Sequence, residues 1–169
     1  NVVLDLGANI ECNEKNLVDF ACMGSALFKS LFEIDKPKIA LLNIGLEENK
    51  GNDVLKKTFS ILKNENLKNF EFMGYIEGNQ IMDGNVDVIV TDGFTGNIAL
   101  KTAEGTAKFI TKNFKNSLNN LSLLISYRSL KKFKEKLDPR KYNGAIFLGL
   151  QSPVVKSHGS TDAVGFAHS

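Results

Sequence analysis

Short apolar runs alternate with longer amphipathic stretches over the first hundred residues, and this alternation is what most limits the possible folds. The short runs are typical of buried strands, and the apolar spacing between them is typical of helices. Strands that alternate with helices form a parallel sheet covered on both faces. We therefore expect one α/β domain, or part of one, over residues 1–169, with three αβα layers. The expected strands are Val2–Leu6, Lys38–Asn43, Phe70–Tyr75 and Val86–Val90, and the expected helices are Glu14–Phe32, Asn52–Leu62 and one that begins near Asn97.

Three of the expected strands end in the same way, with Asp or Asn followed soon by glycine. The first strand leads into Asp5–Asn9, the second into Asn43–Gly45 and the last into Asp92–Gly96. Ligands of open α/β sheets bind at the carboxyl ends of the strands. This repeated pattern, with Lys50 at the opening of the next helix, therefore favours an anionic ligand. None of the loops fits a dinucleotide fingerprint or a P-loop, which argues against a conventional dehydrogenase or kinase.

The stretch Asp92–Asn97 is the most informative of these loops. A helix that starts there presents free backbone N–H groups and the positive end of its dipole, and both favour an anion. Gly93 and Gly96 let the backbone bend sharply and approach a ligand closely. The alternative is structural, with Thr95 or Asn97 only capping the helix. The stretch by itself does not decide between the two interpretations.

The composition is that of an ordinary globular protein, with 43% hydrophobic and 24% charged residues. The net charge of +2 gives no argument for nucleic-acid binding. No apolar stretch is long enough to span a membrane. Cys12 and Cys22 form no metal motif, so we expect two free thiols in a reducing cytoplasm. The chain begins at Asn1, directly before an apolar run, which suggests a piece of a longer protein.

Two further segments carry unusual side chains. Lys108–Lys136 has eight basic residues and one acid, a net charge of +7, with apolar residues interleaved. Such a stretch suits an acidic partner protein or an anionic membrane surface, or it packs its apolar side in a dimer core. In the second segment, Lys156–Ser160, His158 lies among a lysine, two hydroxyls and a glycine. A ligand or catalytic role for His158 competes with simple packing or capping, and Ser160 is a candidate cap.

Together these segments resemble the bacterial phosphate acyltransferases of phospholipid synthesis, which make acyl phosphate from acyl-acyl carrier protein and inorganic phosphate. The resemblance covers almost the whole chain in the family's order and implies an isocitrate/isopropylmalate dehydrogenase-like fold with a helical protrusion at residues 108–137. Leu46, Gln151 and Ser152 depart from the family's pattern. The matching segments are Leu4–Asn9, Met23–Ser25, Leu41–Gly45 with Lys50–Gly51, Asp92–Asn97 with Leu100–Thr102, Tyr142–Ala145 and Lys156–Gly159.

The resemblance implies that phosphate attacks a thioester, with no cofactor and no metal. We expect His158, Lys156 and Asn97 to act in catalysis. Because an ionised Asp92 would repel phosphate, we expect it to orient the backbone or a lysine. The residues expected to form the phosphate or substrate site are Asp5, Gly7, Asn9, Asn43, Gly45, Lys50, Asp92, Gly93, Thr95, Gly96 and Ser160.

The resemblance also implies partners. These are acyl-acyl carrier protein, inorganic phosphate and a second copy of the chain, with no nucleic acid. A cytoplasmic protein in loose peripheral contact with the membrane, next to a downstream membrane acyltransferase, is expected. A coenzyme A-dependent phosphate acetyl- or butyryltransferase and a non-catalytic binding relative are the alternatives. The residues expected to contact carrier protein or membrane are Arg128, Lys131, Lys132 and Lys134.

Overall fold

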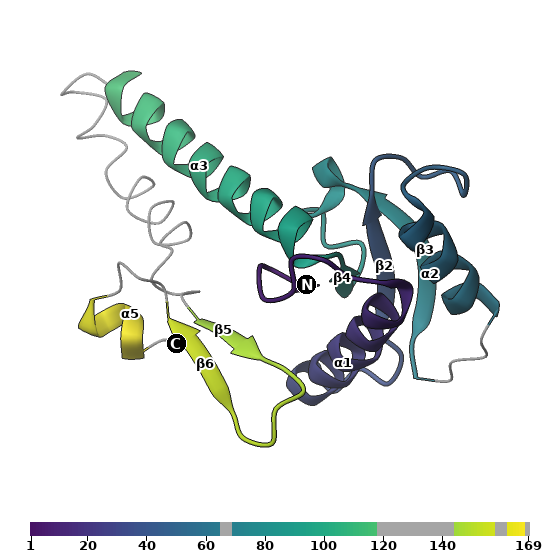
Figure 1. Cartoon of the computed structure of the whole chain (residues 1–169). Helices are drawn as coiled ribbons and strands as arrows, with labels where there is room; N and C mark the ends of the chain where they lie inside the picture. The colour runs from purple at the N-terminus through teal and green to yellow at the C-terminus, as the bar shows by residue number, and fades with distance from the viewer. Residues whose placement is uncertain (65–68, 118–143, 158–161, 168–169) are drawn as a thin grey trace. The chain divides into compact units, whose positions relative to one another are not determined.

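The computed structural model describes residues 1–64, 69–117, 144–157 and 162–167 (Figure 1). The chain divides into two compact units, Asn1–Ala103 and Glu104–Ser169. Helix α3, Gly93–Ser117, runs from the first unit into the second.

The first unit is built on a four-stranded parallel sheet in the order β1–β4–β2–β3. Its strands are β1 (Val2–Leu4), β2 (Lys38–Asn43), β3 (Glu71–Glu77) and β4 (Val88–Val90). Strand β4 comes last along the chain but lies between β1 and β2, and Val90 pairs with both Leu4 and Leu41. The parallel sheet confirms the α/β class and fits the expected three-layer arrangement. The more specific dehydrogenase-like fold stays a prediction.

Helices α1 (Glu14–Phe32) and α2 (Asp53–Asn64) connect the first three strands. The range of α1 agrees with the prediction because its ends carry clear stop signals. Asn13 and Asn16 cap the first turn reciprocally, each side chain accepting the other's backbone N–H at 3.0 Å. At the other end Glu33 adopts the left-handed conformation, with φ of 56°, and its N–H bonds to the carbonyl of Lys29.

The core consists of two apolar clusters, one on each face of the sheet. Residues alternate between the faces along β2, so Ile39 and Leu41 join one cluster and Ala40 and Leu42 the other. Both α1 and α2 contribute to the first cluster. The second includes Ile81, from the β3–β4 connection that contains the short 3-10 helix η1, Gly78–Gln80. Because both faces are covered, β2 is buried from Ile39 to Asn43.

The predicted start of the last helix near Asn97 is wrong, because α3 begins four residues earlier, at Gly93. Two glycines lower helix propensity, and for that reason the sequence pattern indicated a loop here. The backbone of Gly96 nevertheless donates to the carbonyl of Asp92 at 2.9 Å, so helical hydrogen bonding starts at once. The stretch Asp92–Asn97 is therefore the first turn of a helix and not a loop before it.

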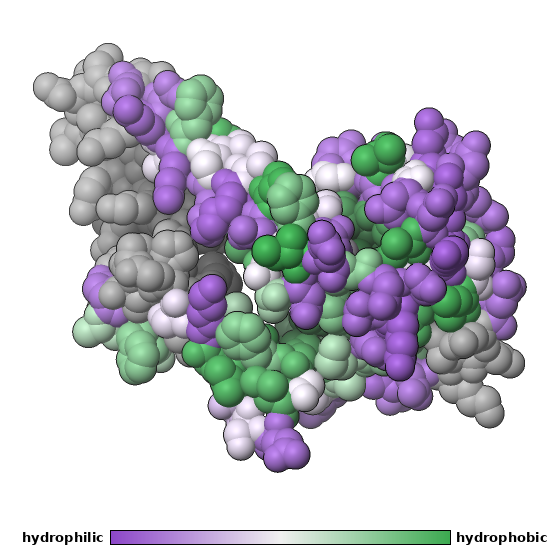
Figure 2. All heavy atoms as spheres, in the orientation of Figure 1, coloured by the Kyte–Doolittle hydropathy of each residue, from purple (hydrophilic) through white to green (hydrophobic). Residues whose placement is uncertain are grey.

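The described part of the second unit contains the end of α3, an antiparallel hairpin of β5 (Gly144–Phe147) and β6 (Val154–Ser157), and the short helix α5 (Ala163–Ala167). Figure 2 shows hydrophobic side chains over this hairpin. They include Ile146, Leu150 and Val155, all exposed. In the described ranges, no helix has both the length and the apolar character needed to cross a bilayer.

Candidate functional site at the carboxyl edge of the sheet

The loop that follows β1 meets the start of α3 at the carboxyl edge of the sheet. The N–H of Gly93 donates to the carbonyl of Asn9 at 2.8 Å. One step closer to the sheet, Asp5 and Thr91 extend the pairing of the two strands, with Asp5 N–H to Thr91 carbonyl at 2.8 Å. The expectation that these loops share an edge is therefore confirmed.

Gly93 and Gly96 make this meeting possible, because the backbone of the Asp5–Asn9 loop lies against them. A Cβ added to Gly93 would lie 2.6 Å from the carbonyl oxygen of Asn9, and one added to Gly96 would overlap with the carbonyl oxygen of Asp5. Neither glycine has a positive φ. They are required for contact between two backbone segments, whereas the sequence suggested a sharp bend toward a ligand.

Asp5 holds its own loop in shape. Asp5 is only 7% exposed, and its carboxylate accepts the N–H groups of Gly7 and Ala8 at 2.9 Å each. It also accepts the backbone and side-chain N–H groups of Asn9 at 2.6 and 2.9 Å. Burial acts to raise the pKa of Asp5, but these hydrogen bonds outweigh it and hold the pKa below its ordinary value. The amides of this loop are thus bound to an ionised carboxylate of the same chain.

Asp92 is the cap of α3. Its carboxylate accepts the backbone N–H of Thr95 and the Thr95 hydroxyl, both at 2.8 Å. This confirms that Asp92 orients backbone. The alternative in which Thr95 or Asn97 caps the helix is wrong, because both lie inside α3. The amides of Gly93 and Thr95 are already bonded, and the side chains of Thr95 and Asn97 are exposed on this turn.

The loop after β2 is closed by Asn43. This buried side chain donates to the carbonyl of Lys50 at 3.2 Å and accepts the N–H of Ile44 at 2.8 Å. Gly51 has a φ of +85°, and a Cβ there would lie 2.5 Å from the Asn43 side-chain oxygen. Asn43 therefore fixes the loop that carries the exposed Lys50 and the buried Gly45.

Cys12 lies at the same junction, a position that the sequence pattern did not indicate. Its thiol donates to the carbonyl of Asn9 at 3.4 Å. Burial raises the pKa of Cys12, and the nearby charges of Asp92 and Asp5 raise it further, while the amide of Gly93 acts in the opposite direction. The thiol is thus held neutral. The one sequence signal was its place three residues after Asn9.

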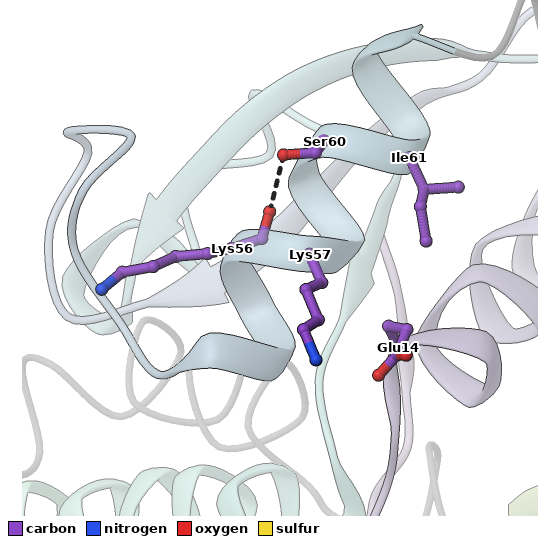
Figure 3. A pocket seen from close by; sticks show the side chains of 5 residues that line it. All are labelled: Glu14, Lys56, Lys57, Ser60 and Ile61. Carbon is purple, nitrogen blue, oxygen red and sulfur yellow. Dashed lines mark hydrogen bonds between the residues drawn. The ribbon is translucent and has the colours of Figure 1, made fainter.

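A separate open pocket of about 420 Å³ lies between the start of α1 and the outer side of α2 (Figure 3). In this view the Lys57 side chain extends toward Glu14, and the Ser60 hydroxyl donates to the carbonyl of Lys56 at 3.0 Å. None of the residues expected to bind phosphate lines the pocket. Across the described ranges, no group of three or more His, Cys, Asp or Glu residues is placed to hold a metal ion.

The other predicted site residues belong to the second unit. Lys156 is exposed on β6, in the second unit. The remaining predicted residues lie outside the described ranges, and their roles stay predictions. They are His158, Ser160, Arg128, Lys131, Lys132 and Lys134.

Comparison with known proteins agrees with the resemblance found in the sequence. The model of a family described as fatty acid synthesis protein matches residues 1–169. The chain belongs to this family. The curated relatives of this chain include one named phosphate acyltransferase from Pelagibacter ubique, 63% identical over 174 residues, which cover all of this chain and 52% of the relative. Relatives with the same name from Paramagnetospirillum magneticum and Maricaulis maris are 51% and 46% identical, and 49% of each is covered.

The chain spans about half the length of the curated relatives it matches. The fatty acid synthesis family is thus shown along the whole chain, while the other half of each relative has no counterpart here.

Proposed function

We propose that the protein carrying this chain is an acyltransferase that forms acyl phosphate from acyl-acyl carrier protein and inorganic phosphate, in phospholipid synthesis. The observation that carries the proposal is the match of the whole chain to proteins named phosphate acyltransferase. The junction of the Asp5–Asn9 loop with the start of α3 supports it, since ligands of open α/β sheets bind at this edge.

The reaction requires the protein mainly to position the two reactants and to neutralise negative charge. An oxygen of phosphate attacks the thioester carbonyl carbon, the carbon–sulfur bond breaks, and the carrier leaves as a thiolate that takes up a proton. A thiol of pKa about 8.5 is a fairly good leaving group, so a strong acid is not essential. Donors aimed at the developing oxyanion contribute a few kcal/mol each. No covalent intermediate with Cys12 is needed, in keeping with its raised pKa.

The proposed roles follow from the geometry where the structure describes the residue. Asp5 and Asp92 shape the two loops, because their oxygens accept hydrogen bonds from the loops themselves. Asn97 and Lys50, both exposed, are proposed to meet the phosphate or the oxyanion. His158 and Lys156 are proposed for proton transfer and charge neutralisation on the basis of the resemblance.

The test is an acyl phosphate assay on the complete polypeptide that carries this sequence, with acyl-carrier protein and phosphate. We expect Asn97→Asp to lower kcat/KM for phosphate at least tenfold, or about 1.4 kcal/mol, because it places a negative charge beside the anion. Asn85→Asp is the matched control, since Asn85 is exposed before β4, at the opposite edge of the sheet. Equal losses in both variants would remove Asn97 from the site. Faster turnover of acyl-coenzyme A would favour the runner-up enzyme, and no product from either donor would refute the function.

We further propose that the basic segment Lys108–Lys136 docks the acidic carrier protein and an anionic membrane surface, and that the protein is a homodimer. Lys108 and Lys112 are exposed on α3. Binding to carrier protein and to anionic vesicles is expected to weaken several-fold between about 50 and 300 mM salt, since exposed charges are screened. Replacing Lys108 and Lys112 with Glu should weaken both further, and Lys36→Glu, exposed before β2, should not. Binding that does not change with salt would contradict the charge role.

A further inference from the structure

The carboxyl edge of the sheet carries large apolar side chains as well as polar ones. They belong to the loop after β1, the loop after β2 and the first turns of α3. Their exposed fractions run from 52% for Ile98 to 81% for Ile44. Figure 2 shows hydrophobic side chains over the start of α3, among hydrophilic neighbours. We define the apolar rim as Ile10, Ile44, Leu46, Phe94 and Ile98.

Every member of the apolar rim is the chain neighbour of a residue assigned to the polar site. Ile10 follows Asn9, Ile44 follows Asn43, and Ile98 follows Asn97. The other two members also follow site residues, since Leu46 follows Gly45 and Phe94 follows Gly93. Polar and apolar groups therefore alternate around one edge. A ligand that satisfies both has a polar reacting end joined to an apolar chain.

Hydrogen bonds hold the backbone at or next to several members of the apolar rim. Ile10 follows directly on Asn9, whose carbonyl accepts the Gly93 N–H, and Phe94 follows that glycine. Ile44 donates its own N–H to Asn43, the residue that closes the loop after β2. Since β4 lies between β1 and β2, the three segments are neighbours at this edge. Exposed apolar groups that gather at one edge of a sheet are suited to bind an apolar ligand.

We infer that the apolar rim holds the hydrocarbon chain of the acyl donor and so selects long acyl chains over short ones. This inference rests on the proposed function, whose reaction places the thioester carbonyl beside Asn97. Each methylene that leaves water contributes to binding, whereas a short acyl group offers almost none. The rim thus contributes to the affinity for the chain, and the polar residues between its members align the carbonyl.

The decisive experiment compares two donors on the complete polypeptide. The double variant Ile10→Asn, Ile44→Asn is assayed with hexanoyl- and hexadecanoyl-carrier protein. We expect kcat/KM to fall at least tenfold for the long donor and less than twofold for the short one. The matched control is Leu31→Asn with Ile34→Asn, two exposed apolar residues at the end of α1, away from this edge. The control should keep the preference for the long donor.

Equal losses with both donors, or no loss, would overturn the inference. So would a preserved chain-length preference accompanied by a change in oligomeric mass or in melting temperature, because the rim would then be a protein interface.

Binding of a fluorescent fatty acid, cis-parinaric acid, is measured in parallel. If no donor gives acyl phosphate, the proposed function fails. Probe binding that is lost only in the rim variant would then still support apolar-chain binding, and an absence of binding would refute it.

Discussion

Replacement of Gly96 by alanine is expected to destabilise this chain more than any other single methyl addition in α3. The new Cβ would overlap with the carbonyl oxygen of Asp5 and lie 2.9 Å from the Thr91 side chain. Backbone atoms cannot move aside as a flexible side chain does, so either α3 or the loop must shift. We expect a loss of about 3 kcal/mol or more in the free energy of unfolding. Denaturant unfolding followed by circular dichroism measures it.

Gly105→Ala is the matched control, on the same helix. No atom lies within 4 Å of a Cβ placed on Gly105, and the residue is exposed. In an open helical position alanine is favoured over glycine, so this variant should be more stable by about 0.5–1 kcal/mol. If both variants behave alike, the close contact between α3 and the Asp5–Asn9 loop is not what Gly96 provides.

Asp5→Asn is expected to have the second largest effect. The buried carboxylate accepts four hydrogen bonds, and an amide in its place would turn its own NH2 group toward backbone N–H donors. A buried donor left without an acceptor costs about 1–3 kcal/mol, so we expect a loss of about 3 kcal/mol in unfolding free energy. Asp83→Asn, exposed in the β3–β4 connection, should change stability little. A near-neutral Asp5→Asn would show that the loop keeps its shape without the charge.

The same carboxylate predicts how stability depends on pH. The pKa of Asp5 is lowered in the folded chain, below an unfolded value of about 3.9. The folded state therefore gains from ionised Asp5 above about pH 4 and loses this contribution as the pH falls through the folded pKa. The difference in unfolding free energy between wild type and Asp5→Asn should shrink from pH 7 toward pH 3. A difference that stays constant over this range would contradict the assignment.

The elements of the first unit could be predicted where their ends carry local signals. Glu14–Phe32 was predicted correctly because Asn13 caps it and an apolar stripe follows. The start of α3 was not, because Gly93 and Gly96 have low helix propensity. What overrides that propensity is the long-range contact with Asn9 and Asp5. A pattern of neighbours along the chain contains no information about such a contact.

The sequence predicted which edge of the sheet carries the site, but it did not predict the hydrogen bonds within the site. Because parallel strands end in Asp or Asn and then glycine, the loops after them were expected to lie together at the carboxyl edge. The hydrogen bond between Gly93 and Asn9 confirms this for the first and last loops. The same residues suggested free amides for an anion. In the structure the amides of the first loop donate to Asp5 and that of Thr95 donates to Asp92, because a carboxylate two to four residues away along the chain can reach them. Cys12 was missed since its contact to Asn9 depends on the path of the loop.

The place of β4 in the sheet has a consequence for the order in which the molecule is assembled. β1 pairs with no described strand other than β4, and β4 is separated from it by more than eighty residues. During synthesis, β2, α2 and β3 can associate early, while β1 must wait for β4 to insert beside β2. Closing a loop of that length is entropically costly and slow. The junction of the Asp5–Asn9 loop with the start of α3 is therefore among the last parts of the first unit to form, and a ribosome-bound chain that has not yet released β4 and α3 lacks this junction.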